Sequence, residues 1–404
     1  MEAESRIIQV AGGVTAPRGF RASGVEAQIK YANRKDLALI FSERPARAAA
    51  VYTRNLVKAA PILVTREHLE GESIAAVVVN AGCANACTGE RGMQDAREMA
   101  AAAARRLGLI PRQVAVASTG VIGSYLPMER VIAGIERAVV ELSPQGGSDA
   151  ARAIMTTDTC PKETAVSFSL QGKTATIGGM AKGSGMIHPD LATLLVFITT
   201  DAQVEPGLLQ ETLNRSVERS FNRVSVDGDT STNDMVLMLA NGAAGCSVES
   251  GEDREVFQRA LDLVTARLAQ EVARDGEGAT RLIEVRVERA ASEEEAARAA
   301  RAVVRSNLVK SAVYGRDANW GRILAAVGYS GIEFDPQRVD IWLGEVAVAE
   351  QGRGLAFDED RARELLGQDR VVITVSLNRG TERAVAWGCD LTPEYVHINA
   401  SYRS

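Results

Sequence analysis

The chain has 404 residues, of which 46% are apolar and 24% charged, with a formal net charge of −6. This composition is typical of a soluble globular protein, and the acidic balance excludes a general nucleic-acid binder, which needs a basic surface. No long uncharged apolar run predicts a transmembrane helix, and residues 1–20 lack the basic start and apolar stretch of a signal peptide. We therefore expect a cytoplasmic protein with no membrane or nucleic-acid partner, and the length suggests two large lobes.

Apolar runs and helical spacing predict a mixture of strands and helices along the chain. Strands are expected over residues 75–80, 114–117, 164–170, 173–177, 194–198, 282–288, 339–343, 371–377 and 383–387. Helices are expected over residues 95–107, 127–142, 206–222, 253–274, 292–305 and 360–366. Strands and helices do not alternate regularly, so the predicted class is α/β (α+β) with mixed sheets. A weak lobe boundary falls at residues 275–282.

The cysteines and histidines do not form a metal-binding or disulfide pattern. The five cysteines are scattered, which is unlike a disulfide framework. Cys83 and Cys87 are four residues apart, but no second Cys/His pair lies nearby to complete a zinc site. We therefore predict no metal.

Two segments resemble ligand-binding loops only in part. Gly172-Lys-Thr174 resembles the end of a phosphate-binding loop, but the earlier glycine is absent and the segment lies in a predicted strand–turn–strand. Residues 227–233 resemble a calcium loop but lack its glycine and its final glutamate. A loop whose side chains bond their own backbone is the favoured interpretation of residues 227–233.

Residues 178–202 carry the chemical signal of the sequence. Lys182 lies among glycines and small residues, where the backbone can approach a ligand closely. Thr193 opens a strongly apolar strand directly after this glycine-rich stretch. Its position suits a nucleophile exposed by a backbone cut, but spacing alone favours an ordinary β-branched residue at a strand start.

The same segment resembles the cleavage signature of the ornithine acetyltransferases, also called bifunctional glutamate N-acetyltransferases of arginine biosynthesis. Their pattern is approximately K-G-x-G-M-I-x-P-N-M-A-T-M-L, and here it reads KGSGMIHPDLATLL from Lys182. Asp190 replaces the usual Asn, while Leu191 and Leu194 replace Met. Further segments resemble family motifs in the expected order: residues 13–20, 117–123, 153–162, 220–234, 275–280, 315–322, 395–399 and 402–404.

The resemblance implies a self-cleaving enzyme whose chain is cut between Ala192 and Thr193. Thr193 would then be an N-terminal nucleophile that uses its own amine as base, which suits a chain with only three histidines. Thr119 (hydroxyl) and Gly120 (backbone N–H) would stabilise the oxyanion. The substrate-binding residues implied are Thr159, Lys182, Thr193, Glu277, Asn399 and the C-terminal Ser404.

The implied reaction moves an acetyl group from N2-acetylornithine to glutamate and needs no prosthetic group; use of acetyl-CoA as a co-substrate is left open. The implied fold is a layered α/β sandwich over residues 1–280 with a smaller α/β lobe over residues 281–404, and the implied assembly is a heterotetramer or larger oligomer of the two self-cleaved chains. Two alternatives remain: a self-cleaving amidohydrolase or aminopeptidase, in which water resolves the acyl-enzyme, and a non-catalytic binding protein.

Overall fold

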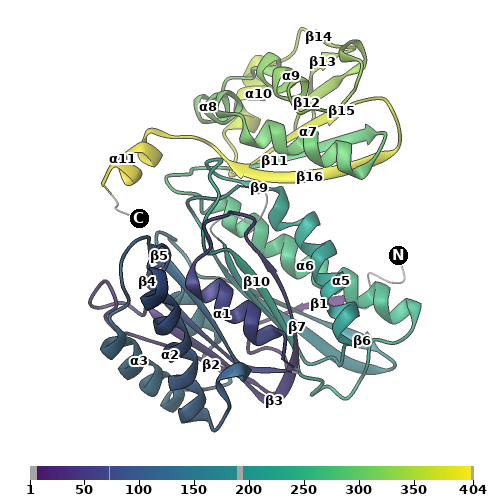
Figure 1. The fold of residues 1–404 in the computed structure, drawn as a ribbon. Coiled ribbons are helices and arrows are strands. Elements are labelled where there is room, and N and C mark those ends of the chain that lie inside the picture. Colours follow the sequence, from purple (N-terminus) through teal and green to yellow (C-terminus); the bar gives the residue numbers. More distant parts are fainter. Residues whose placement is uncertain (1–6, 72, 189–193, 402–404) are drawn as a thin grey trace.

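The computed structural model describes residues 7–71, 73–188 and 194–401 and contains two sheets flanked by helices (Figure 1). The strands of the first sheet are β1 (Ile7–Val10), β2 (Phe20–Val25), β3 (Leu37–Tyr52), β4 (Ile74–Cys83), β5 (Val114–Val121), β6 (Lys162–Leu170), β7 (Lys173–Lys182), β8 (Leu195–Thr200) and β10 (Met235–Ala240). The helices associated with it are α1 (Ala60–Leu69), α2 (Gly89–Leu107), α3 (Met128–Val140), α4 (Gly147–Ala153), α5 (Pro206–Arg219) and α6 (Gly251–Arg274).

The long strand β3 joins the two halves of the first sheet. The strand order is β1-β6-β7-β8-β10-β3-β4-β5, and β2 also pairs with β3. The first part of β3 pairs with β2 and β4, whereas residues 47–52 pair with β10. Because β3 belongs to both halves of the sheet, the half with β4 and β5 and the half with β8 and β10 can pack their apolar faces against each other.

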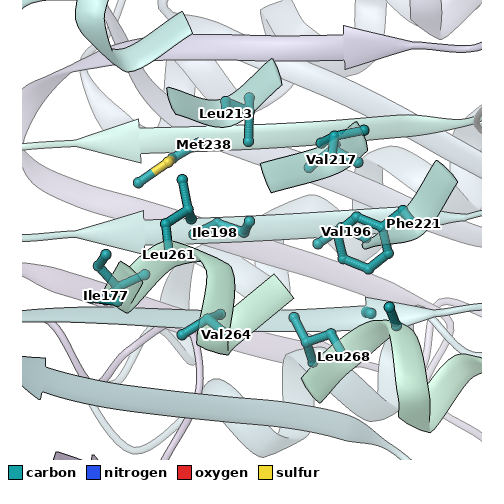
Figure 2. Close-up of a cluster of buried hydrophobic side chains, with 14 of the residues drawn as sticks. Ile177, Val196, Ile198, Leu213, Val217, Phe221, Met238, Leu261, Val264 and Leu268 are labelled. Atoms are coloured by element: carbon teal, nitrogen blue, oxygen red, sulfur yellow. The ribbon is translucent and has the colours of Figure 1, made fainter. Parts of the chain in front are cut away.

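Alternating side chains show how the layers pack. In β8, Phe197 lies in the apolar cluster shared with β4 and β5, while Val196 and Ile198 lie in the cluster shared with α5 and α6. Figure 2 shows this outer cluster, in which Leu213 and Leu261 from the two helices cover the sheet. A separate cluster packs α2 and α3 against β4 and β5. The predicted layered α/β sandwich is thus confirmed, with helices on the outside and the two sheet halves between them.

The second sheet lies in the upper lobe of Figure 1 and has its own apolar core. Its strand order is β14-β13-β12-β15-β11-β16-β9. These strands are β9 (Val224–Ser225), β11 (Leu282–Ala290), β12 (Asp340–Leu343), β13 (Val346–Glu350), β14 (Arg353–Gly354), β15 (Arg370–Ser376) and β16 (Glu382–Cys389). The remaining helices are α7 (Glu293–Arg305), α8 (Asn307–Gly315), α9 (Trp320–Gly328), α10 (Glu359–Leu366) and α11 (Pro393–Ser401). β9 precedes residue 280 but pairs with β16, so the boundary at residues 280/281 stays a prediction.

The two segments that resemble a phosphate-binding loop and a calcium loop have structural roles. Residues 171 and 172 form the turn between β6 and β7, which is a hairpin position and not a strand-to-helix phosphate loop. In the loop after β9, the Asp227 carboxylate accepts the backbone N–H of Asp229, and the Ser231 hydroxyl accepts that of Asn233. Within the described ranges, no helix is long and apolar enough to cross a membrane.

Candidate active site

The strands on either side of the predicted cut are direct neighbours in the sheet. β7 and β8 pair antiparallel, with Lys182 opposite Leu195. Ala192 and Thr193 lie outside the described residues, which resume at Leu194. The register therefore places Lys182 beside the strand that begins two residues after the proposed nucleophile.

Asp234 holds the backbone at Leu194. Its Oδ1 accepts the Leu194 N–H at 2.8 Å, and the Met235 N–H donates to the Leu194 carbonyl at 3.0 Å. Asp234 is fully buried, and burial raises its pKa well above the ordinary value, although the Leu194 N–H and the charge of Lys182 favour the ionised form. A buried carboxyl group thus fixes the residue directly after Thr193.

Lys182 belongs to a buried network of alternating charge. Asp158 lies 2.7 Å from the Lys162 ammonium and 3.8 Å from that of Lys182, and Lys162 also contacts Asp275 at 2.5 Å. Burial alone would raise the pKa of Asp158, but the ammonium groups of Lys182 and Lys162 outweigh burial and hold it well below its usual range. Burial lowers the pKa of Lys182, and the nearby Lys162 adds to that effect.

Thr159 adjoins this network at the surface. Its backbone N–H donates to the Asp275 carboxylate at 3.0 Å, and its hydroxyl donates to the same carboxylate. Asp275 therefore connects the exposed Thr159 with the buried Lys162. The structure brings Thr159 and Lys182, both predicted from the sequence, to the same network.

Glu277 and Asn399 meet although they are far apart in the chain. The Asn399 side-chain amide donates to Glu277 Oε2 at 2.8 Å, and the Glu277 backbone N–H donates to the Ser184 carbonyl at 2.9 Å. A Cβ at Gly185 would lie 2.5 Å from the Glu277 carboxyl group, so this glycine leaves room for the carboxylate. Glu277 is close enough to Lys182 to favour its charged form. Ser404 lies outside the described residues.

Thr119 and Gly120 lie at the end of β5. Thr119 is 2% exposed. Gly120 has φ +129°, and a Cβ there would lie 2.3 Å from the carbonyl carbon of Gly82, so glycine is required. The Asn233 amide donates to the Ser118 carbonyl at 2.8 Å. Since Asn233 directly precedes Asp234, this bond connects the end of β5 with the backbone anchor of Leu194.

Four carboxylate and lysine residues of the site were not among the predicted site residues: Asp158, Lys162, Asp234 and Asp275. The i, i+4 spacing of Asp158 and Lys162 was a usable signal, but their partners are distant in sequence. Within residues 7–71, 73–188 and 194–401, no group of three or more His, Cys, Asp or Glu side chains is placed to hold a metal ion.

The chain is similar to proteins of one family. The ArgJ family profile matches residues 21–404. The arginine biosynthesis bifunctional protein ArgJ of Symbiobacterium thermophilum is 58% identical over 399 residues, covering 98% of this chain and 99% of that protein. A crystal structure of the Bacillus halodurans arginine biosynthesis bifunctional protein has TM-score 0.50 and 48% identity, covering 51% of this chain and 98% of that one. The ornithine acetyltransferase of Mycobacterium tuberculosis, solved with ornithine, has TM-score 0.43 and 43% identity, covering 47% of this chain and 100% of that one.

Proposed function

The chain belongs to the ArgJ family, and we propose that Thr193 carries the chemistry of this acetyltransferase of arginine biosynthesis. The observation that carries the assignment is the buried Lys182 beside the start of β8, with carboxylates of Asp158 and Glu277 around it. Amino-acid substrates carry a negative carboxylate and a positive ammonium group. A site with a buried cation and buried carboxylates is suited to bind them.

The first reaction is self-cleavage. The Thr193 hydroxyl oxygen attacks the carbonyl carbon of Ala192, the C–N bond breaks, and residues 1–192 become an ester on Thr193. Water then hydrolyses the ester and leaves Thr193 with a free amine. The hydrogen bond from Leu194 to Asp234 supports this step because it fixes the backbone one residue beyond the attacking group. The Bacillus halodurans chain matches about half of this sequence, which supports two separate fragments.

The second reaction is acetyl transfer in two halves. The Thr193 hydroxyl attacks the acetyl carbonyl of N2-acetylornithine while its own amine takes the proton, and ornithine leaves as the protonated amine. The α-amine of glutamate then attacks the acetyl ester and regenerates the hydroxyl. Thr119 and Gly120 donate to the oxyanion in each half, and such a donor contributes about 3 kcal/mol.

The remaining residues recognise the substrates. Lys182 attracts the α-carboxylate, while Glu277 and Asn399 hold the amine-bearing end. Thr159, which is exposed beside the Lys162–Asp275 pair, and Ser404 complete the proposed set of substrate-binding residues. We propose acetyl-CoA as a second acetyl donor to glutamate, no prosthetic group, and an assembly of at least two pairs of self-cleaved chains in the cytoplasm.

The test uses the purified protein with N2-acetylornithine and glutamate. Intact mass and N-terminal sequencing should reveal two fragments, the second beginning at Thr193, and acetylglutamate should form faster than free acetate. Free acetate forming faster would instead assign the chain to the hydrolases, in which water resolves the acyl-enzyme. An unprocessed, inactive but folded chain would favour a binding protein.

A further inference from the structure

An open cleft of about 540 Å³ lies between the segment before the cut and the upper lobe. We call it the arginine cleft. It is lined by His188, Arg298, Arg301, Arg305, Asn307 and Tyr329, among others. His188 follows β7, whereas the three arginines come from α7, at the lower side of the upper lobe in Figure 1. Of the predicted site residues that the structure describes, none lines this cleft.

The three arginines share one face of α7 and are only partly neutralised. Their spacing of three and four residues puts like charges next to one another on the helix, which is unfavourable without a counter-charge. Arg298 donates to the backbone carbonyl of Gly331 at 2.6 Å, and Arg301 lies 3.4 Å from the carboxylate of Glu218.

Arg305 is the group most available to a ligand. Within the described part of the chain, the Arg305 side chain has no hydrogen bond or ion pair. Its Nε lies 4.0 Å from the position that a Cβ would occupy at Gly228, so the guanidinium extends over a position without a side chain. The cleft thus holds a planar cation that has no carboxylate partner among the described residues.

The shape and charge of the cleft point to a phosphate-bearing ligand. Guanidinium groups bind phosphate through paired hydrogen bonds, and several arginines together match a diphosphate better than a single carboxylate. The volume lies within the range of small-molecule sites.

We propose that the arginine cleft binds the phosphate groups of a nucleotide-type small molecule. One source of such a phosphate group is the nucleotide end of acetyl-CoA, and for this source the inference rests on the proposed function. The long pantetheine arm of acetyl-CoA would carry its thioester toward Thr193. His188 lies five residues before Thr193 in the sequence, and the backbone ahead of it is held because Asp227 accepts the N–H groups of Met186 and Ile187. The other source is a free diphosphate or nucleotide that does not take part in the reaction.

The experiment measures binding and two reactions on the processed protein. Calorimetry with CoA and, separately, with sodium pyrophosphate is compared for wild type, Arg305→Gln and the double variant Arg301→Gln/Arg305→Gln. Arg363→Gln, an exposed arginine of α10 in the same lobe, is the matched control. Each lost guanidinium–phosphate contact should weaken CoA binding about tenfold or more. The KM for acetyl-CoA should rise in the two cleft variants, while acetyl exchange between N2-acetylornithine and glutamate stays at the wild-type rate.

The outcomes distinguish acetyl-CoA from a free phosphate compound, and failure of the cleft proposal from failure of the proposed function. Weaker pyrophosphate binding in the variants, with unchanged acetyl-CoA kinetics, would support the cleft as a site for a free phosphate compound. The proposal is overturned if neither probe binds the wild type, or if both bind the double variant as tightly as the wild type. If the wild type does not exchange acetyl groups between N2-acetylornithine and glutamate, the proposed function is contradicted. Calorimetry would still test ligand binding in the arginine cleft.

Discussion

Oδ1 of Asp234 accepts the backbone N–H of Leu194 at 2.8 Å, so a buried carboxyl group positions the residue next to the proposed nucleophile. This contact spans 40 positions of sequence and joins the start of β8 to the start of β10. It provides the reacting segment with a fixed point on the sheet.

Removing this anchor should slow self-cleavage. Asp234→Ala loses the acceptor for the Leu194 N–H, and misplacement of the attacking group should reduce the processing rate about tenfold to a hundredfold. Asp234→Asn keeps an acceptor oxygen and should process faster than Asp234→Ala. The rate is measured from the appearance of the two fragments on denaturing gels.

Asp201 provides a matched control for Asp234, because its carboxylate also accepts backbone N–H groups, from Thr176 and Arg18, at the other end of β8. Asp201→Ala loses the same kind of acceptor and should be processed at the wild-type rate. Equal slowing in Asp201→Ala and Asp234→Ala would mean that Asp234 acts only through general stability.

Thr193 should be indispensable for both reactions. Thr193→Ala removes the attacking oxygen, so we expect a single unprocessed chain and acetyl exchange at the background level. Thr193→Ser keeps the hydroxyl and should still be cut. Thr174→Ala, an exposed threonine of β7, should behave as the wild type. Processing of Thr193→Ala would contradict the assignment.

The Thr119 hydroxyl should act mainly on the rate and little on affinity. Thr119→Val keeps the side-chain shape but removes the donor, so kcat for acetyl exchange should fall about a hundredfold or more while KM changes little. Thr119→Ser restores a hydroxyl and should recover most of the rate. A variant that unfolds at lower denaturant concentration and has normal kcat would indicate a structural role.

Asp158 should stabilise the fold in a pH-dependent way. Its carboxylate neutralises two buried lysines, so Asp158→Asn should lower the free energy of unfolding at pH 7 by about 3–5 kcal/mol. Because its pKa in the folded state is lowered from 3.8, this stabilisation is present above that value and is lost as the pH falls through the lower folded-state pKa.

The wild type and Asp158→Asn should therefore converge in stability only under strongly acidic conditions. Denaturant titrations at several pH values test this, with Glu382→Gln at an exposed position of β16 as the control. A constant difference between the two proteins down to the lowest pH would argue against a charged Asp158 in the folded state.

Sequence periodicity predicted many elements well, because their apolar residues follow the repeat of the element. The helix predicted over residues 253–274 is α6 (Gly251–Arg274), and the strand over residues 282–288 is β11. β3 was not predicted, since residues 43–47 interrupt its apolar run with charged residues and a proline. β10 was also not predicted: its Met, Leu and Ala residues favour helices, and only burial on both faces makes it a strand.

The site residues themselves stay predictions, but the fold brings several of them together. Lys182 and Thr159 meet through the network of Asp158, Lys162 and Asp275, and Glu277 meets Asn399, as a shared site requires. The network itself was not foreseen because Lys162 and Asp275 are 113 positions apart and only the folded chain brings them together. The roles of these residues in the reaction stay predictions.

The pairing of β7 with β8 determines how the two fragments behave after the cut. These neighbours fall on opposite sides of the break and share a ladder from Ile177–Thr200 to Lys182–Leu195. Once processed and denatured, the protein would have to rebuild this ladder from two molecules, so its refolding rate should depend on concentration. An uncut Thr193→Ala chain would refold in a unimolecular step. The cut would therefore make the active protein harder to regenerate than its precursor.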